Sequence, residues 1–154
     1  MKNLGFISVI LTITSISVFY SCECPECFTP PAELYMRILD HADSTDMLFK
    51  NRAIQTDMMF FYKENNIIKY LDFKFENDTI QNKTLFISGY PGFISASGFK
   101  EFYLKINESD TDTIFYDVEE QSDNCCTFFK EKTFKYNGKT IEKDKKEFVY
   151  IITR

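Results

Sequence analysis

Short alternations of apolar and polar residues recur along most of this chain. In residues 33–39, Leu34, Met36 and Ile38 are separated by single residues, which is the two-residue period of a half-buried strand. The same kind of pattern predicts further strands at 56–63, 67–75, 84–88, 101–106, 113–118, 127–136, 139–142 and 147–153. We find no convincing amphipathic helical pattern between them. The chain is therefore predicted to be all-β.

Polar or glycine-containing segments separate the predicted strands. Residues 64–66 are predicted to close one hairpin, and Asn137-Gly138 is the dipeptide that two-residue type I′ turns prefer. Residues 89–92, with two glycines and a proline, are predicted to form a turn. Short strands at this spacing favour an antiparallel β-sandwich over residues 33–154. An immunoglobulin-like topology is one form it could take, and a small β-barrel is the alternative.

The first 21 residues are predicted to be a signal peptide. Lys2 and the free amino terminus supply positive charge, and residues 4–20 form an uncharged, mostly apolar run that ends near a small residue. The alternative is a retained membrane span, which needs about 20 apolar residues. This run is shorter and contains five Ser or Thr residues, so cleavage is favoured.

Phe19-Tyr20-Ser21-Cys22 resembles the lipobox of bacterial lipoproteins. Ser21 and Cys22 match its most informative positions, whereas Phe19 and Tyr20 depart from the usual Leu and small residue. The resemblance implies that Cys22 becomes the lipid-modified amino terminus. It also implies an exported chain in which residues 22–32 are a tether to a bacterial membrane, with the outer membrane expected. An ordinary secretory signal, with Cys22 a free or disulfide-bonded thiol, is the alternative.

Four other cysteines remain, Cys24, Cys27, Cys125 and Cys126, and an even number in an exported chain predicts disulfides. We expect Cys24 and Cys27 each to bond one of the vicinal pair, with the connectivity left open. A thiol oxidoreductase motif at residues 24–27 is disfavoured because two prolines follow it where a helix should begin. A structural zinc site is disfavoured because adjacent cysteines do not form a second C-x₂-C pair.

Residues 27–31, Cys-Phe-Thr-Pro-Pro, together with the late Cys125-Cys126 pair loosely resemble a group of small lipoproteins of unassigned function. That resemblance would cover most of the chain after the signal peptide. It implies no activity.

Charge excludes one class of partner. Without the signal peptide, and hence without Lys2, 17 Lys and Arg face 23 Asp and Glu, which leaves a formal charge of −6. Nucleic-acid binding depends mainly on cationic side chains, so it is excluded. A polybasic attachment to anionic lipid is disfavoured for the same reason.

No residue pattern predicts a catalytic site, a metal site or a cofactor. His41 is the only histidine and lies in a polar segment, where an exposed turn residue is expected. A calcium-binding loop is disfavoured, because the spacing of the oxygen-bearing residues does not match an EF-hand; these residues are Asn107, Glu108, Asp110 and Asp112. We therefore expect a protein that is not an enzyme.

Two adjacent aromatic pairs, Phe60-Phe61 and Phe128-Phe129, give the best sequence indication of a binding surface. Neighbours on a strand point to opposite faces, so one member of each pair should leave the core unless a second layer covers it. The leading hypothesis is a non-enzymatic lipoprotein that binds a protein or glycan partner in the cell envelope. The alternatives are a small inhibitor of a lytic enzyme or protease, with residues 89–98 as its protruding segment, and a hydrolase with scattered carboxylates.

Overall fold

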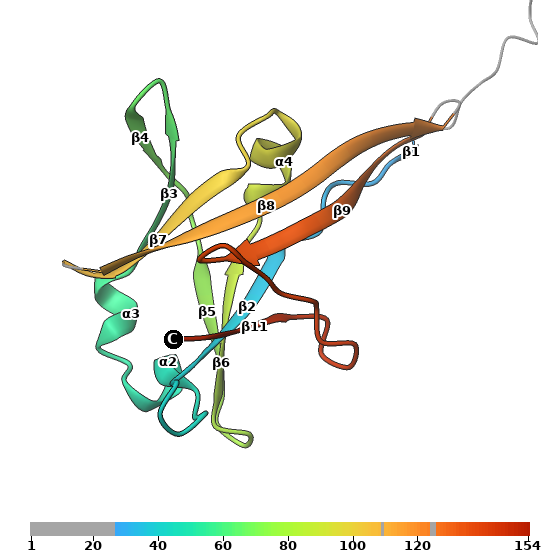
Figure 1. The fold of residues 1–154 in the computed structure, drawn as a ribbon. Coiled ribbons are helices and arrows are strands. Elements are labelled where there is room, and N and C mark those ends of the chain that lie inside the picture. The colour runs from blue at the N-terminus through green and yellow to red at the C-terminus, as the bar shows by residue number, and fades with distance from the viewer. Residues whose placement is uncertain (1–26, 109, 124–125) are drawn as a thin grey trace, which may run out of the picture.

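The computed structural model describes residues 27–108, 110–123 and 126–154, which form two packed β-sheets (Figure 1). The larger sheet has the strand order β1-β9-β8-β7-β3-β4, with β10 paired to β9. Its strands are β1 (Cys27–Phe28), β3 (Met59–Glu64), β4 (Ile67–Tyr70), β7 (Glu101–Asn107), β8 (Asp110–Asp123), β9 (Cys126–Tyr136) and β10 (Lys139–Thr140).

The smaller sheet has the order β11-β2-β6-β5. Its strands are β2 (Leu34–Leu39), β5 (Lys74–Asp78), β6 (Lys83–Ser88) and β11 (Tyr150–Thr153). The described chain also forms three short helices in its connections, α2 (Met47–Lys50), α3 (Ile54–Asp57) and α4 (Pro91–Ala96). In the described residues, neither sheet closes on itself into a barrel. The predicted sandwich is therefore confirmed, and the alternative of a small barrel is wrong.

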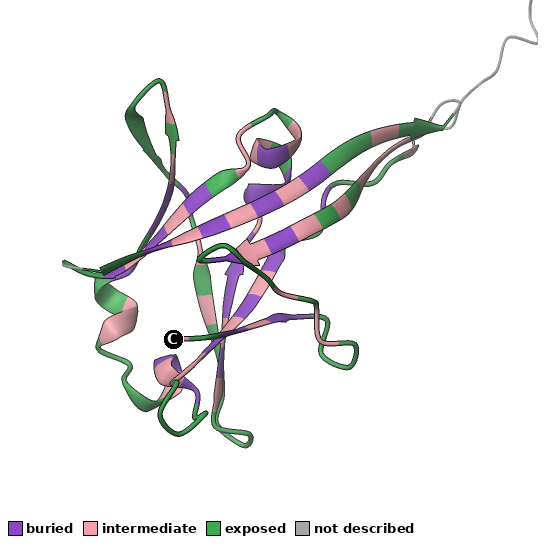
Figure 2. Cartoon of the chain, viewed as in Figure 1, coloured by how far each residue is buried: buried purple, intermediate pink, exposed green. Residues whose placement is uncertain are grey.

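The core lies between the two sheets. Leu34, Met36 and Ile38 are fully buried, which confirms the alternation predicted for this strand. From the larger sheet, Phe60 meets Phe86 of the smaller sheet edge to face, with ring centroids 5.4 Å apart. Buried and partly buried bands alternate along β8 in the same way (Figure 2). Burial of these apolar side chains is the main force that holds the sheets together.

The far end of the β8–β9 hairpin extends beyond the core and is here called the arm. It consists of residues 119–123 of β8 paired with residues 126–130 of β9, and Figure 1 shows it projecting away from the smaller sheet. β1 lies parallel to β9 at the end of the arm, where Cys27 is disulfide-bonded to Cys126 with their Cα atoms 4.8 Å apart. One predicted pairing is thus present, while Cys24 and Cys125 lie outside the described residues. β1 also belongs to the segment that was predicted to be only a tether.

Several predictions about individual elements are wrong. The strand predicted at 67–75 is two strands in different sheets, because the chain crosses between the sheets after Tyr70. The turn predicted at 89–92 instead leads into α4, whose first residue is Pro91, a position that proline favours. The residues predicted to begin a strand at 56 lie in α3. Helices of four to six residues are too short to produce a visible helical period.

The sheets of the sandwich are mixed, although most of their strand pairs are antiparallel. β11 pairs with β2 in parallel, as β1 does with β9, so both sheets are mixed. Side chains alternate with the same period in parallel and antiparallel strands. The sequence pattern therefore could not reveal which strands pair in parallel. The hairpin turns are as predicted, since Asn65, Asn66, Asn137 and Gly138 all have positive φ.

No helix within the described part of the chain is long and apolar enough to cross a membrane.

Candidate functional site

One edge of the larger sheet is an exposed apolar strand. β4 pairs with β3 on one side and, among the described residues, has no strand on its other side. Ile67, Ile68 and Tyr70 are 59%, 45% and 66% exposed, and Lys69 is exposed as well. Unpaired N–H and C=O groups on such a strand can pair with another chain. We call these four residues the β4 edge.

Aromatic side chains continue from the β4 edge onto the outer face of the larger sheet. Phe61 stacks on Tyr103 with ring centroids 5.3 Å apart and contacts Tyr70 at 6.0 Å. The Lys63 ammonium lies 4.6 Å from the centre of the Tyr103 ring, a cation–π distance. Phe61 therefore leaves the core, as predicted for one member of its pair, and is buried all the same because the tyrosines cover it. The result is a broad aromatic surface beside an unpaired edge.

A second aromatic group, here called the arm-base cluster, lies beside the disulfide. Phe28 of β1, Phe93 of α4 and Phe129 of β9 contact one another with ring centroids 5.5–6.4 Å apart. Phe28 is 57% exposed and Phe93 38% exposed. Tyr90, which precedes α4, is 55% exposed. Rings from three elements therefore meet here, with Phe28 and Phe93 exposed and Phe129 partly buried against the core.

The helix in this cluster is fixed to the sheet by a buried serine. The Ser95 hydroxyl donates to the carbonyl of Tyr116 at 2.7 Å and accepts from the amide of Val118 at 2.8 Å. Both partners are on β8, so α4 cannot shift without breaking buried hydrogen bonds. The segment that was expected to protrude as an inhibitory loop is thus packed against the sheet.

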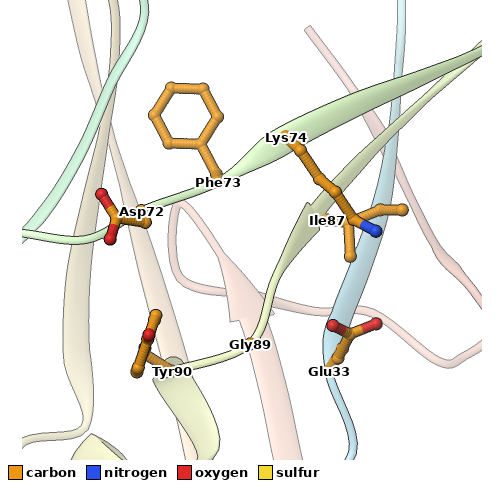
Figure 3. Close-up of a pocket in the computed structure, with 7 residues that line it drawn as sticks. All are labelled: Glu33, Asp72, Phe73, Lys74, Ile87, Gly89 and Tyr90. Carbon is orange, nitrogen blue, oxygen red and sulfur yellow. The ribbon is translucent and has the colours of Figure 1, made fainter.

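A pocket of about 340 Å³ opens at one end of the smaller sheet. Figure 3 shows the Asp72 carboxyl and the Tyr90 side chain on one side of it, with Glu33 and Ile87 on the other. A Glu33 carboxylate oxygen accepts a hydrogen bond from the Tyr35 hydroxyl at 2.5 Å. Two carboxylates and an exposed aromatic side chain suit a ligand that carries hydroxyl groups, because carboxylate oxygens accept hydrogen bonds.

The strongest pKa shift among the described residues belongs to Tyr116, in a polar cluster between the sheets. Tyr116 donates to Glu131 at 2.5 Å, Tyr150 donates to the same carboxylate at 3.3 Å, and Lys143 forms an ion pair with it. Burial, and then the bond to Glu131, raise the pKa of Tyr116 far above its usual value. The hydroxyl stays protonated as a structural donor, so this cluster stabilises the fold and takes no part in a surface site.

The residues that the sequence singled out for chemistry have structural partners. His41 lies in an exposed turn, as predicted. Asp110 and Asp112 both form ion pairs with Arg154, and Asp112 also accepts a hydrogen bond from Asn137 at 2.8 Å. In the described part of the chain, no group of three or more His, Cys, Asp or Glu side chains is placed to hold a metal ion.

The sequence pointed to Phe61 and Phe129 as members of aromatic pairs, but it did not predict that they lie at two different surfaces. It also did not predict the β4 edge beside Phe61. The β4 edge was hidden inside a strand predicted to run to residue 75. The consecutive Ile67 and Ile68 interrupt the apolar–polar alternation there, and this was the signal that could have marked an exposed edge.

No protein-family model, curated protein or solved structure matches this chain. The fold is a mixed two-sheet β-sandwich with a disulfide-bonded arm.

Proposed function

We propose that this chain is an exported lipoprotein, attached to a bacterial membrane through Cys22, that acts as a non-enzymatic binding component of the cell envelope. Its partner is a protein that adds an extended strand to the β4 edge. The lipobox-like residues 19–22 support the anchor. The Cys27–Cys126 disulfide supports export, because disulfides persist mainly in oxidising compartments outside the cytosol.

The observation that carries the binding role is the exposure of the β4 edge. A free strand offers backbone hydrogen bonds, and its side chains then select the partner. Ile68 and Tyr70 lie on the same face as Phe61, so an added strand would extend the aromatic surface. Lys63 is exposed on this same face, and Lys69 is exposed on the other face of β4. The chemistry fits a partner strand in which apolar residues alternate with acidic ones.

Site-specific photo-crosslinking in the producing bacterium tests this proposal. A photoreactive residue at position 68 should give adducts of one or a few discrete masses. The matched control is position 80, because Ile80 is 93% exposed and lies in the turn between β5 and β6. Equal labelling at both positions would show that exposure alone, and no docked partner, produced the adducts.

Glycan recognition is a second candidate function, favoured by the pocket of Figure 3. Asp72→Asn together with Tyr90→Ala should then abolish binding to envelope polysaccharide while leaving crosslinking at position 68 intact. Unchanged polysaccharide binding in this variant would remove the pocket from consideration.

A further inference from the structure

The arm-base cluster exposes aromatic surface that no contact within the described chain explains. Phe28 and Phe93 are each more than a third exposed, although their rings stack on each other across two segments, β1 and α4. Aromatic side chains normally contribute most to stability when they are buried in a core. Here the rings are held at the surface by the disulfide on one side and by the Ser95 hydrogen bonds on the other. A rigid exposed aromatic group of this kind marks an interaction site.

The length of chain before the cluster restricts what can cover it. Cys22 precedes Cys27 by five residues, which span at most about 16–18 Å when fully extended. Cys27 is covalently fixed to Cys126 at the end of the arm. Phe28 is one residue further on, so it lies within about 20–22 Å of Cys22 along the chain at the most. A lipid on Cys22 would keep this cluster close to the membrane surface.

We infer that the arm-base cluster rests on the membrane that holds the lipid anchor and so fixes the orientation of the domain. This inference depends on the lipid attachment proposed above. Aromatic and aliphatic side chains of interfacial segments bury their apolar parts at the boundary between headgroups and acyl chains. Phe28 and Phe93 supply the apolar rings for this contact.

Charge defines the kind of membrane contact. The exposed acidic residues of the arm are Glu119, Glu120 and Asp123, against the exposed Lys130 within it. A net acidic arm is not drawn to anionic lipid. The contact is therefore apolar, and it forms on uncharged phosphatidylcholine vesicles and persists at high salt.

The sheet order then gives the direction in which the domain faces. β1 and β4 are the opposite edges of the larger sheet. With the β1 side on the membrane, the β4 edge is held away from it, where it is accessible to a partner strand.

The chain contains no tryptophan, so a single introduced tryptophan is an unambiguous fluorescent probe. Phe28→Trp and, separately, Phe93→Trp are placed in the full-length gene, and the mature protein is purified from membranes and reconstituted into phosphatidylcholine vesicles. The matched control is Ile80→Trp, in the exposed turn between β5 and β6 of the smaller sheet. Vesicles with and without brominated acyl chains are compared, and vesicle flotation is recorded for each variant.

At least about twofold quenching by brominated lipid is expected for the probes at positions 28 and 93, because interfacial side chains lie within reach of the acyl chains. The probe at position 80 should be unaffected. If the protein floats with the vesicles and neither probe is quenched more than the control, the docking inference is wrong while the anchor stands. If the protein does not float, the lipid attachment itself is wrong and the docking inference falls with it.

Discussion

The two edges of the larger sheet end in different ways. At one edge, a two-residue strand, β1, is covalently bonded to its neighbour through Cys27 and Cys126. At the other edge, β4 is a complete hairpin strand whose residues are all exposed. Both edges carry aromatic side chains, but Phe28 at the β1 edge follows the lipobox-like Cys22 closely in the sequence, whereas β4 is the opposite edge of the sheet. We propose that this contrast separates two roles, with the β1 edge attaching the domain to the membrane and the β4 edge binding a partner.

Loss of the disulfides should have the largest effect. If Cys24 and Cys125 pair as expected, replacing all four cysteines with Ser should lower the free energy of unfolding by roughly 3–5 kcal/mol, since loops of about a hundred residues lose their closure. Replacing only Cys27 and Cys126 should cost less than half of that, because the other bond closes nearly the same loop. Urea denaturation of the three proteins measures both differences. Equal losses in the two variants would mean that Cys24 and Cys125 do not bond.

The second-largest effect should be a difference in stability between substitutions in the aromatic groups at the two edges. Phe61 is 8% exposed beneath two tyrosines, whereas Phe28 is 57% exposed. Phe61→Ala should therefore lower the free energy of unfolding by about 2–3 kcal/mol, and Phe28→Ala by less than about 1 kcal/mol. Thermal and urea denaturation without membranes give both values. A Phe28 variant as unstable as the Phe61 variant would mean that the arm-base cluster stabilises the fold, which would argue against its role as a membrane contact.

A charge placed on the β4 edge should disrupt binding with little effect on folding. Ile68→Arg should reduce crosslinking from position 70 at least about tenfold, because a buried unpaired charge at an interface is strongly unfavourable. Its free energy of unfolding should change by less than about 0.5 kcal/mol, as for other exposed substitutions. Ile80→Arg is the matched control and should leave crosslinking intact. Undiminished crosslinking in Ile68→Arg would exclude the β4 edge as the contact.

The smallest effect concerns an ion pair between β8 and β9, where the arm begins. The Lys132 ammonium lies 2.6 Å from a Glu119 carboxylate oxygen and lowers the pKa of Glu119 below its usual value of 4.5, with help from Gln121. A lowered pKa means that the ion pair stabilises the folded state above pH 4.5. This contribution is lost as the pH falls through the lower value in the folded protein.

Carboxyl chemical shifts followed by NMR should therefore give a titration midpoint for Glu119 below 4.5. Lys132→Gln should raise that midpoint toward the usual value. An unchanged midpoint in the variant would remove Lys132 as the cause.

The sequence could predict the strands whose apolar residues face the core, because Leu34, Met36 and Ile38 must be buried together and their spacing shows it. It could not predict where the chain changes sheets. Leu71 is buried, and its amide donates to the carbonyl of Phe60 at 2.8 Å, so the crossing is stabilised by a contact with a residue that lies eleven positions earlier. The length of the arm was hidden for a related reason, because residues 119–123 are polar and pair without a core beneath them.

The candidate surfaces were predictable only in part. The Phe60-Phe61 pair showed that an aromatic ring had to leave the core on this strand, since neighbouring side chains point to opposite faces. The arm-base cluster joins Phe28, Phe93 and Phe129, which are far apart in the sequence and meet only because β1 pairs with β9 and α4 packs on β8. Such contacts depend on the order of strands in the sheet, which local sequence patterns do not predict.

The intact mass of the native protein extracted from membranes, taken before and after reduction, tests the central claim most directly. We predict the mass of residues 22–154 plus a lipid, which increases by four hydrogens on reduction as two disulfides open. A lipid-free mass with Cys22 inside a disulfide would contradict the account. The protein would then be a freely secreted domain, and neither edge of its larger sheet would be tied to a membrane.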